Sequence, residues 1–162
     1  MTLKYHTRRD YMKIIGKNPI TGLDYPDLDV IRVDDTYYMV STTMHFVPGC
    51  EILRSYDLVH WEHLSYVYER LDSTEEQRLV GEKNCYGKGM WAASLRYHKG
   101  MYYICFVAND TGKTYLYTAD NIEGPWEKRI IEGFYHDCSL LFEEDHVYIC
   151  LLYTSDAADE AR

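Results

Sequence analysis

Three segments of this chain align with one another without gaps, and this internal repeat constrains the fold more than any other feature. The segments begin at Asp29, Ser94 and Ser139, and each runs through an apolar stretch, a polar turn and a second stretch rich in apolar and aromatic residues. Two such stretches joined by a short polar turn predict a β-hairpin. The repeat therefore predicts three homologous hairpins, at residues 29–40, 94–105 and 139–150.

More strand-like sequence follows each of the first two hairpins, at residues 52–55 and 115–118, and each unit closes on a Trp-Glu pair at residues 61–62 and 126–127. Four-stranded units repeated along a chain are typical of the blades of a β-propeller. A β-sandwich is the alternative, but it does not require repeats that align this closely. We predict an all-β propeller, truncated to about two and a half blades.

The interval between the first two hairpins contains extra sequence at residues 65–90. Within it, the run from Ser73 to Glu76 has the pattern of a capping box, which begins helices. We expect an insertion with one or two helical turns that either shapes the rim of a binding site or is a tolerated surface loop.

The two ends of the chain differ from the repeats. Residues 1–17 lack the apolar run of a signal peptide and are predicted to be an extension, which favours a cytoplasmic location. Residues 18–149 are predicted to form the partial propeller. Residues 150–160 match one reading frame of a transposon-end sequencing adapter, so we expect 150–162 to be a non-native tail; a natural acidic tail is the alternative.

The net charge of −9 restricts the partners that this chain can bind. A surface that binds phosphates needs basic residues, so we expect no nucleic acid and no anionic membrane as a partner. The five cysteines form no C-x-x-C pair and no zinc-site spacing, so the sequence predicts no metal and no cofactor. Nothing in the sequence indicates the oligomeric state.

The repeat register places two carboxylates at equivalent positions. Asp27, Ala92 and Asp137 each stand two residues before an aligned hairpin. Innermost strands line the axis of a propeller, so Asp27 and Asp137 are expected to project into one axial pocket. A single aspartate could simply cap a turn, but two in register favour the carboxylate pair that hydrolyses glycosidic bonds.

Several motifs, in order, resemble the opening blades of glycoside hydrolase family 43 across residues 18–149. They are NPITGLDYPD at 18–27, STTMHFVPG at 41–49, RSYDLVHW at 54–61, WAAS at 91–94 and HDCSL at 136–140. The chain departs from the family pattern at Leu28, Ala93 and Cys138, where proline is common, and at Met44, where an aromatic residue is frequent. Both carboxylates are in place.

The resemblance implies a five-bladed β-propeller and an inverting glycosidase with three carboxyl groups. Asp27 would be the general base that activates water, and Asp137 would raise the pKa of the general acid and orient it. The acid would be a Glu of the fourth blade, so we expect this chain alone to be inactive. Glu123-Gly124-Pro125 mimics the acid motif, but it precedes Asp137 and aligns with the end of a blade, so we interpret it as a turn.

Three side chains are predicted to contact the substrate. Trp91 would stack on a sugar ring, and Phe46 and Met44 would form pocket walls, with core packing as the alternative. The resemblance implies removal of terminal xylosyl or arabinofuranosyl residues from plant-derived oligosaccharides. The alternative from another class is a non-catalytic carbohydrate-binding propeller.

Overall fold

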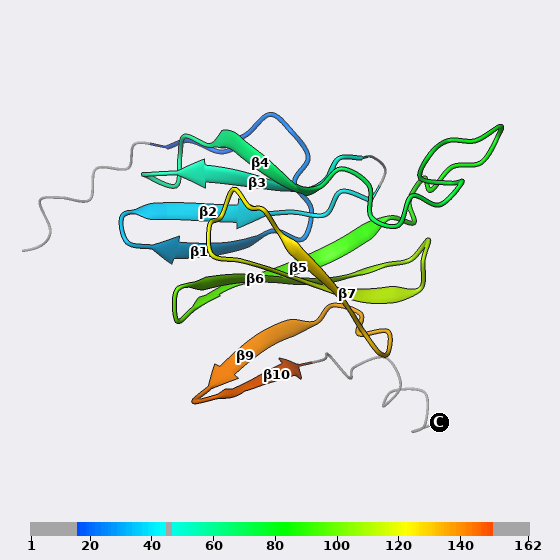
Figure 1. Ribbon diagram of the computed structural model, residues 1–162. Helices are drawn as coiled ribbons and strands as arrows, with labels where there is room; N and C mark the ends of the chain where they lie inside the picture. The colour runs from blue at the N-terminus through cyan, green and yellow to red at the C-terminus, as the bar shows by residue number, and fades with distance from the viewer. Residues whose placement is uncertain (1–15, 45–46, 151–162) are drawn as a thin grey trace, which may run out of the picture.

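The computed structural model describes residues 16–44 and 47–150, and in these ranges the regular secondary structure consists of ten β-strands. The strands form three antiparallel sheets that lie side by side (Figure 1). The first sheet contains β1 (Asp29–Val33), β2 (Thr36–Val40), β3 (Gly49–Ser55) and β4 (Glu62–Tyr68). The second contains β5 (Met90–His98), β6 (Met101–Ala108), β7 (Lys113–Ala119) and β8 (Glu127–Ile131), and the third contains β9 (Ser139–Glu143) and β10 (His146–Cys150).

The three predicted hairpins are confirmed. Each has a two-residue turn, closed by the pairs Val33 with Thr36, His98 with Met101, and Glu143 with His146. The first turn residue is left-handed in all three, with φ of 52° at Asp34, 48° at Lys99 and 51° at Glu144. The strands of each blade pair in chain order, as in the predicted propeller blade. In the two complete blades the Trp-Glu pair stands at the start of the fourth strand, which begins at Glu62 and Glu127, rather than at its end.

The insertion lies between β4 and β5, at residues 69–89. Of the one or two helical turns expected there, the structure has one, in which the Arg78 N–H donates to the Thr74 carbonyl at 3.0 Å. Thr74 rather than Ser73 caps this turn, because the Thr74 hydroxyl accepts from the Gln77 N–H at 3.2 Å. The turn ends at Leu79, whose left-handed φ of 55° does not continue a helix. No helix of the described ranges is both long and apolar enough to cross a membrane.

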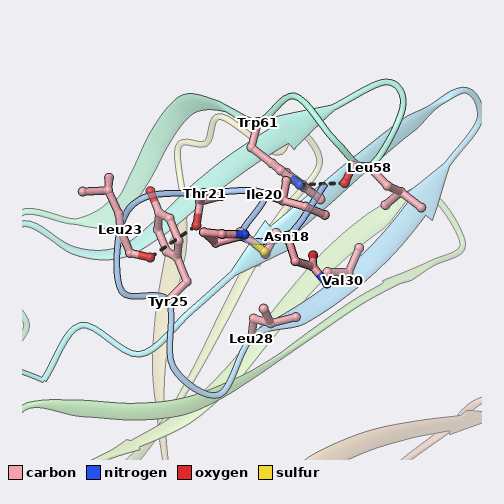
Figure 2. Close-up of a pocket in the computed structure, with 11 residues that line it drawn as sticks. Asn18, Ile20, Thr21, Leu23, Tyr25, Leu28, Val30, Leu58 and Trp61 are labelled. Carbon is pink, nitrogen blue, oxygen red and sulfur yellow. Dashed lines mark hydrogen bonds between the residues drawn. The ribbon is translucent and has the colours of Figure 1, made fainter. Parts of the chain in front are cut away.

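The first blade has two faces with different surroundings. Val30 and Met39 pair across β1 and β2 and line a cavity of about 420 Å³ on the face turned away from the second blade (Figure 2). Residues 18–25 and the loop that carries Leu58 and Trp61 form the other walls. No carboxylate of the described residues lines this cavity, so it lacks the groups expected of the active site.

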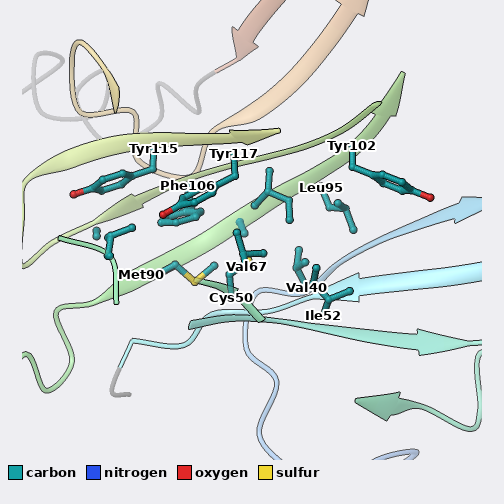
Figure 3. Close-up of a cluster of buried hydrophobic side chains, with 14 of the residues drawn as sticks. Val40, Cys50, Ile52, Val67, Met90, Leu95, Tyr102, Phe106, Tyr115 and Tyr117 are labelled. Atoms are coloured by element: carbon teal, nitrogen blue, oxygen red, sulfur yellow. The ribbon is translucent and has the colours of Figure 1, made fainter. Parts of the chain in front are cut away.

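The opposite face of the first blade packs against the second blade and forms the main core (Figure 3). Side chains alternate between the faces of a strand, so Val40 and Ile52 turn away from the cavity. They face Leu95, Phe106 and Tyr115 of the second blade, and all five are 0% exposed. Burying each such side chain contributes about 1.5–3 kcal/mol, so this interface holds the two sheets together.

The innermost strands β1, β5 and β9 contact one another in succession, as a propeller requires. The same hydrogen bond recurs at both contacts: the Leu95 N–H donates to Asp29 Oδ2 at 2.9 Å, and the Leu140 N–H donates to Ser94 Oγ at 3.4 Å. Asp29 and Ser94 are equivalent positions of the repeat. Each copy of the repeat therefore provides, at this position, a side-chain acceptor that binds the backbone of the next blade.

Arg96 on β5 connects all three sheets. Its guanidinium donates to Asp29 Oδ2 at 2.6 Å, to Ser139 Oγ at 2.7 Å and to the Leu140 carbonyl at 3.2 Å.

The predicted domain boundaries stay predictions. β10 includes Cys150, and the rest of the predicted tail lies outside the described residues.

Candidate active site at the entrance of the inner strands

The three register positions share one unusual backbone conformation. Asp27, Ala92 and Asp137 have φ of 51°, 30° and 49°, in the left-handed region that residues with a Cβ seldom adopt. In the second blade the cause is visible as a β-bulge between Trp91 and Ser94, which kinks the chain before the regular part of β5. β1 and β9 begin just after the same kink, so each aspartate projects from a bend at the entrance of an inner strand.

Thr42 holds the carboxylate of Asp27. Its hydroxyl donates to Asp27 Oδ2 at 3.1 Å and accepts from the Ala92 N–H at 2.9 Å. The Pro26 carbonyl accepts from the Ser41 hydroxyl at 2.6 Å and from the Thr42 N–H at 3.1 Å, which fixes the preceding loop. Thr42 is 6% exposed whereas Asp27 is exposed. The carboxylate is therefore positioned by a buried group while remaining open to a water molecule or ligand.

Asp137 lies beside the predicted stacking residue. His136 Nδ1 is 3.3 Å from Asp137 Oδ2, and both side chains are about half exposed, at 46% and 49%. The ring of His136 meets the indole of Trp91 edge to face, with centroids 5.6 Å apart. Trp91 Nε1 donates to the Gly87 carbonyl at 3.2 Å, which fixes the indole. The structure thus brings Trp91 and Asp137 together through His136.

The two aspartates are joined by a continuous run of contacts through the start of β5. Thr42 connects Asp27 to the backbone of Ala92, and the adjacent Trp91 connects to His136 and so to Asp137. Sequence reasoning assigned no role in the site to Thr42, and for His136 it left open a hydrogen bond to a sugar hydroxyl or a purely structural role. His136 could be recognised in the sequence because it is next to Asp137. The bond between Thr42 and Ala92 joins residues far apart in the chain, and no sequence pattern near either residue predicts it.

The other predicted residues are placed differently. Met44 is half-buried, its carbonyl accepts from the Gly89 N–H at 3.0 Å, and its side chain lines a small cavity beneath the insertion with Tyr68 and Cys85. Its role as a substrate wall stays a prediction. Phe46 lies outside the described residues. Glu123 lies in the turn between β7 and β8, in agreement with its interpretation as a turn residue.

The site contains oxygen, nitrogen and aromatic groups suited to a polar, ring-shaped ligand. Within residues 16–44 and 47–150, no group of three or more His, Cys, Asp or Glu side chains is placed to hold a metal ion. Repeated antiparallel blades, with aspartates at equivalent positions just before the inner strands β1 and β9, define a β-propeller of the glycosidase type. More narrowly, the chain belongs to the glycosyl hydrolases family 43, whose family model matches residues 16–158.

Individual relatives agree with this assignment. The chain is 34% identical over 149 residues to a β-xylosidase of Formosa agariphila, and 36% identical over 138 residues to a non-reducing end α-L-arabinofuranosidase of Bacteroides ovatus. These alignments cover 89% and 82% of this chain but 25% of each relative. The structure is similar to that of a bifunctional GH43-CE protein of Bacteroides eggerthii, with a TM-score of 0.79 and 47% identity over 84% of this chain and 19% of that one.

The fold of the similar family 43 structures is a five-bladed β-propeller. This chain forms two complete blades and the first hairpin of a third, as predicted from the repeat. It spans about a quarter of the length of the two relatives named above.

Proposed function

We propose that this chain is part of an inverting glycosidase that releases terminal xylosyl or arabinofuranosyl residues from oligosaccharides. The observation that carries the proposal is the shared kink that presents Asp27 and Asp137, both exposed, at the entrances of inner strands joined by contacts through β5. The names of the relatives, a β-xylosidase and an α-L-arabinofuranosidase, support the class of sugar.

In the proposed mechanism Asp27 is the general base. Thr42 holds Oδ2, and we assign Oδ1 to the proton of the attacking water. Inverting glycosidases separate base and acid by roughly 6.5–9.5 Å so that this water fits between the base and the sugar. The acid comes from another part of the whole protein. Asp137 raises the pKa of that acid through its negative charge, which favours the protonated form that must donate a proton.

Trp91 is proposed as the platform for the sugar. Its indole is half-buried and fixed by the bond from Nε1 to Gly87. Because the indole is already ordered, stacking of a sugar ring on it costs the protein little conformational entropy. His136 lies between this platform and Asp137 and is positioned to hydrogen-bond a sugar hydroxyl. Oligosaccharide is therefore the proposed substrate.

The test uses the whole protein that contains this chain, assayed on p-nitrophenyl β-xyloside and p-nitrophenyl α-L-arabinofuranoside. Asp27→Asn is expected to lower kcat by roughly 10²–10⁴-fold, the usual contribution of a general base. Asp35→Asn is the matched control, because Asp35 is 98% exposed in the turn of the same blade, and it should retain full activity.

The anomeric configuration of the first product, followed by NMR, tests the stereochemistry. An inverted product supports the assignment of Asp27 as base, and a retained configuration would contradict it. A folded whole protein that hydrolyses neither substrate would contradict the proposed xylosyl and arabinofuranosyl substrates. An Asp27→Asn variant as active as the wild type would contradict the role of Asp27 as general base.

A further inference from the structure

Two cysteine thiols meet between the second blade and the third hairpin. Cys105 Sγ on β6 lies 3.5 Å from Cys138 Sγ, in the segment just before β9. Cys105 is 0% and Cys138 5% exposed. Leu140, Tyr103 and Phe142 surround the pair with apolar groups. These thiols are free in the structure, and neither takes part in the proposed catalytic mechanism.

The two thiols differ in acidity. The hydrogen bond that the two thiols share lowers the pKa of Cys138, aided by a backbone N–H. The shared bond and burial raise the pKa of Cys105. Cys138, the sulfur nearer to solvent, is therefore the thiol of the pair that loses its proton more readily. A thiolate with a second thiol in contact is the arrangement that oxidises to a disulfide rather than to higher acids.

The contact links the third hairpin to the second blade. Among the described strands, β9 and β10 pair only with each other, so contacts with the second blade hold this hairpin in place. Further links to the second blade include polar bonds from Arg96 and Lys99, the bond from the Leu140 N–H to Ser94, and the packing of Phe142 against His98 and Tyr103. A covalent bond at this place would fix the hairpin, and with it the backbone next to Asp137.

We propose that Cys105 and Cys138 are an oxidative modification site, at which a peroxide forms a reversible disulfide that fastens the third hairpin to the second blade. The Cys138 thiolate attacks one peroxide oxygen, which breaks the O–O bond and leaves a sulfenic acid and one water. The Cys105 thiol then attacks that sulfur, forms the S–S bond and releases a second water. Two thiols and one hydrogen peroxide thus give one disulfide and two waters.

This inference is independent of the proposed glycosidase activity, and its test needs no substrate. The reduced whole protein that contains this chain is treated with hydrogen peroxide, its remaining thiols are blocked with N-ethylmaleimide, and it is digested without reductant. Trypsin must be combined with Glu-C, because Cys138 and Cys150 share a tryptic peptide that Glu143 and Glu144 divide. We expect mass spectrometry to find one cross-linked peptide pair, which contains Cys105 and Cys138 and disappears on reduction.

The thermal midpoint gives a second readout. The cross-link closes the chain from residue 105 to 138, and oxidation is expected to raise Tm by roughly 5–10 °C, reversed by dithiothreitol. Cys138→Ser should abolish both the cross-link and the shift. Cys50→Ser is the matched control, because Cys50 is also 0% exposed but lies in the core between the first two blades, and it should leave the cross-link intact.

Several outcomes would overturn the proposal. One is oxidation of either thiol to sulfinic acid without the cross-linked peptide. Another is a cross-link that forms equally fast in chain unfolded by urea, since it would not depend on the folded geometry. If Cys138→Ser does not fold, peptide mapping of the wild-type chain still decides whether Cys105 pairs with Cys138 or with Cys85 or Cys150.

Discussion

At the scale of single residues, Thr42 matters most to the geometry of the candidate site. Its side chain contacts both the Asp27 carboxylate and the backbone of the second blade. Because Thr42 is almost completely buried, water cannot replace its hydroxyl without rearrangement. The position of Asp27 therefore depends on a group that makes no contact with the substrate in the proposed mechanism.

Thr42→Val is expected to lower the free energy of unfolding by about 1–3 kcal/mol, because the Ala92 N–H loses its acceptor while the shape of the side chain is kept. Thr42→Ser keeps the hydroxyl and should lose clearly less. Urea denaturation of the two variants measures the difference. Equal losses would mean that the methyl group, and not the hydroxyl, is what the structure needs at this position.

At the scale of elements, the carboxylate of Asp72 helps to attach the insertion between β4 and β5 to the second blade. Asp72 accepts from Lys113 at 2.7 Å, from Lys128 at 3.0 Å and from the Tyr115 hydroxyl at 2.9 Å. Burial alone would raise the pKa of Asp72, but these three bonds outweigh it and hold the pKa below the ordinary value. The ionised form therefore stabilises the fold.

The stability due to Asp72 is present above the pKa of the unfolded chain, about 4, and is lost as pH falls through the lower pKa of the folded state. Asp72→Asn should therefore lower the free energy of unfolding by about 1–3 kcal/mol at pH 7, and the deficit should shrink below about pH 4. Denaturation at pH 7 and pH 3 measures this. Asp145→Asn, at a carboxylate 91% exposed, should change little at either pH, and a deficit for Asp72→Asn that grew on acidification would contradict the sign.

At the scale of the whole molecule, stability is expected to fall from the second blade to the third hairpin. β6 pairs with β5 and β7, and its residues 104–108 are at most 1% exposed. β10 pairs only with β9 among the described strands, and most of its side chains are exposed. Hydrogen exchange read by mass spectrometry should show the slowest exchange in β6 and the fastest strand exchange in β10. Equal protection of the two strands would show that the chain unfolds as one unit.

The hairpins and the register of the aspartates could be predicted from the sequence because their signals are local or repeated. The alternation of apolar and polar side chains recurs in each copy, and so does the turn that residues 34–35 form in the first. Three weak predictions of a hairpin therefore support one another. The bond from Thr42 to Ala92 and the contact of Cys105 with Cys138 could not be predicted in this way. Each joins residues of different blades, and only the packing of one sheet against the next brings them together.

The kink shared by Asp27, Ala92 and Asp137 has a consequence for how such a chain can evolve. Ala92 adopts a φ of 30° although its side chain has no polar group to place in the site. The conformation at this position is therefore a property of the repeat and not of a catalytic side chain. In a duplicated blade, the bend is inherited with every copy, and a single codon change decides whether a carboxylate occupies it. The ancestral unit would then have supplied the geometry several times over, and selection for catalysis needed only to choose which copies to use.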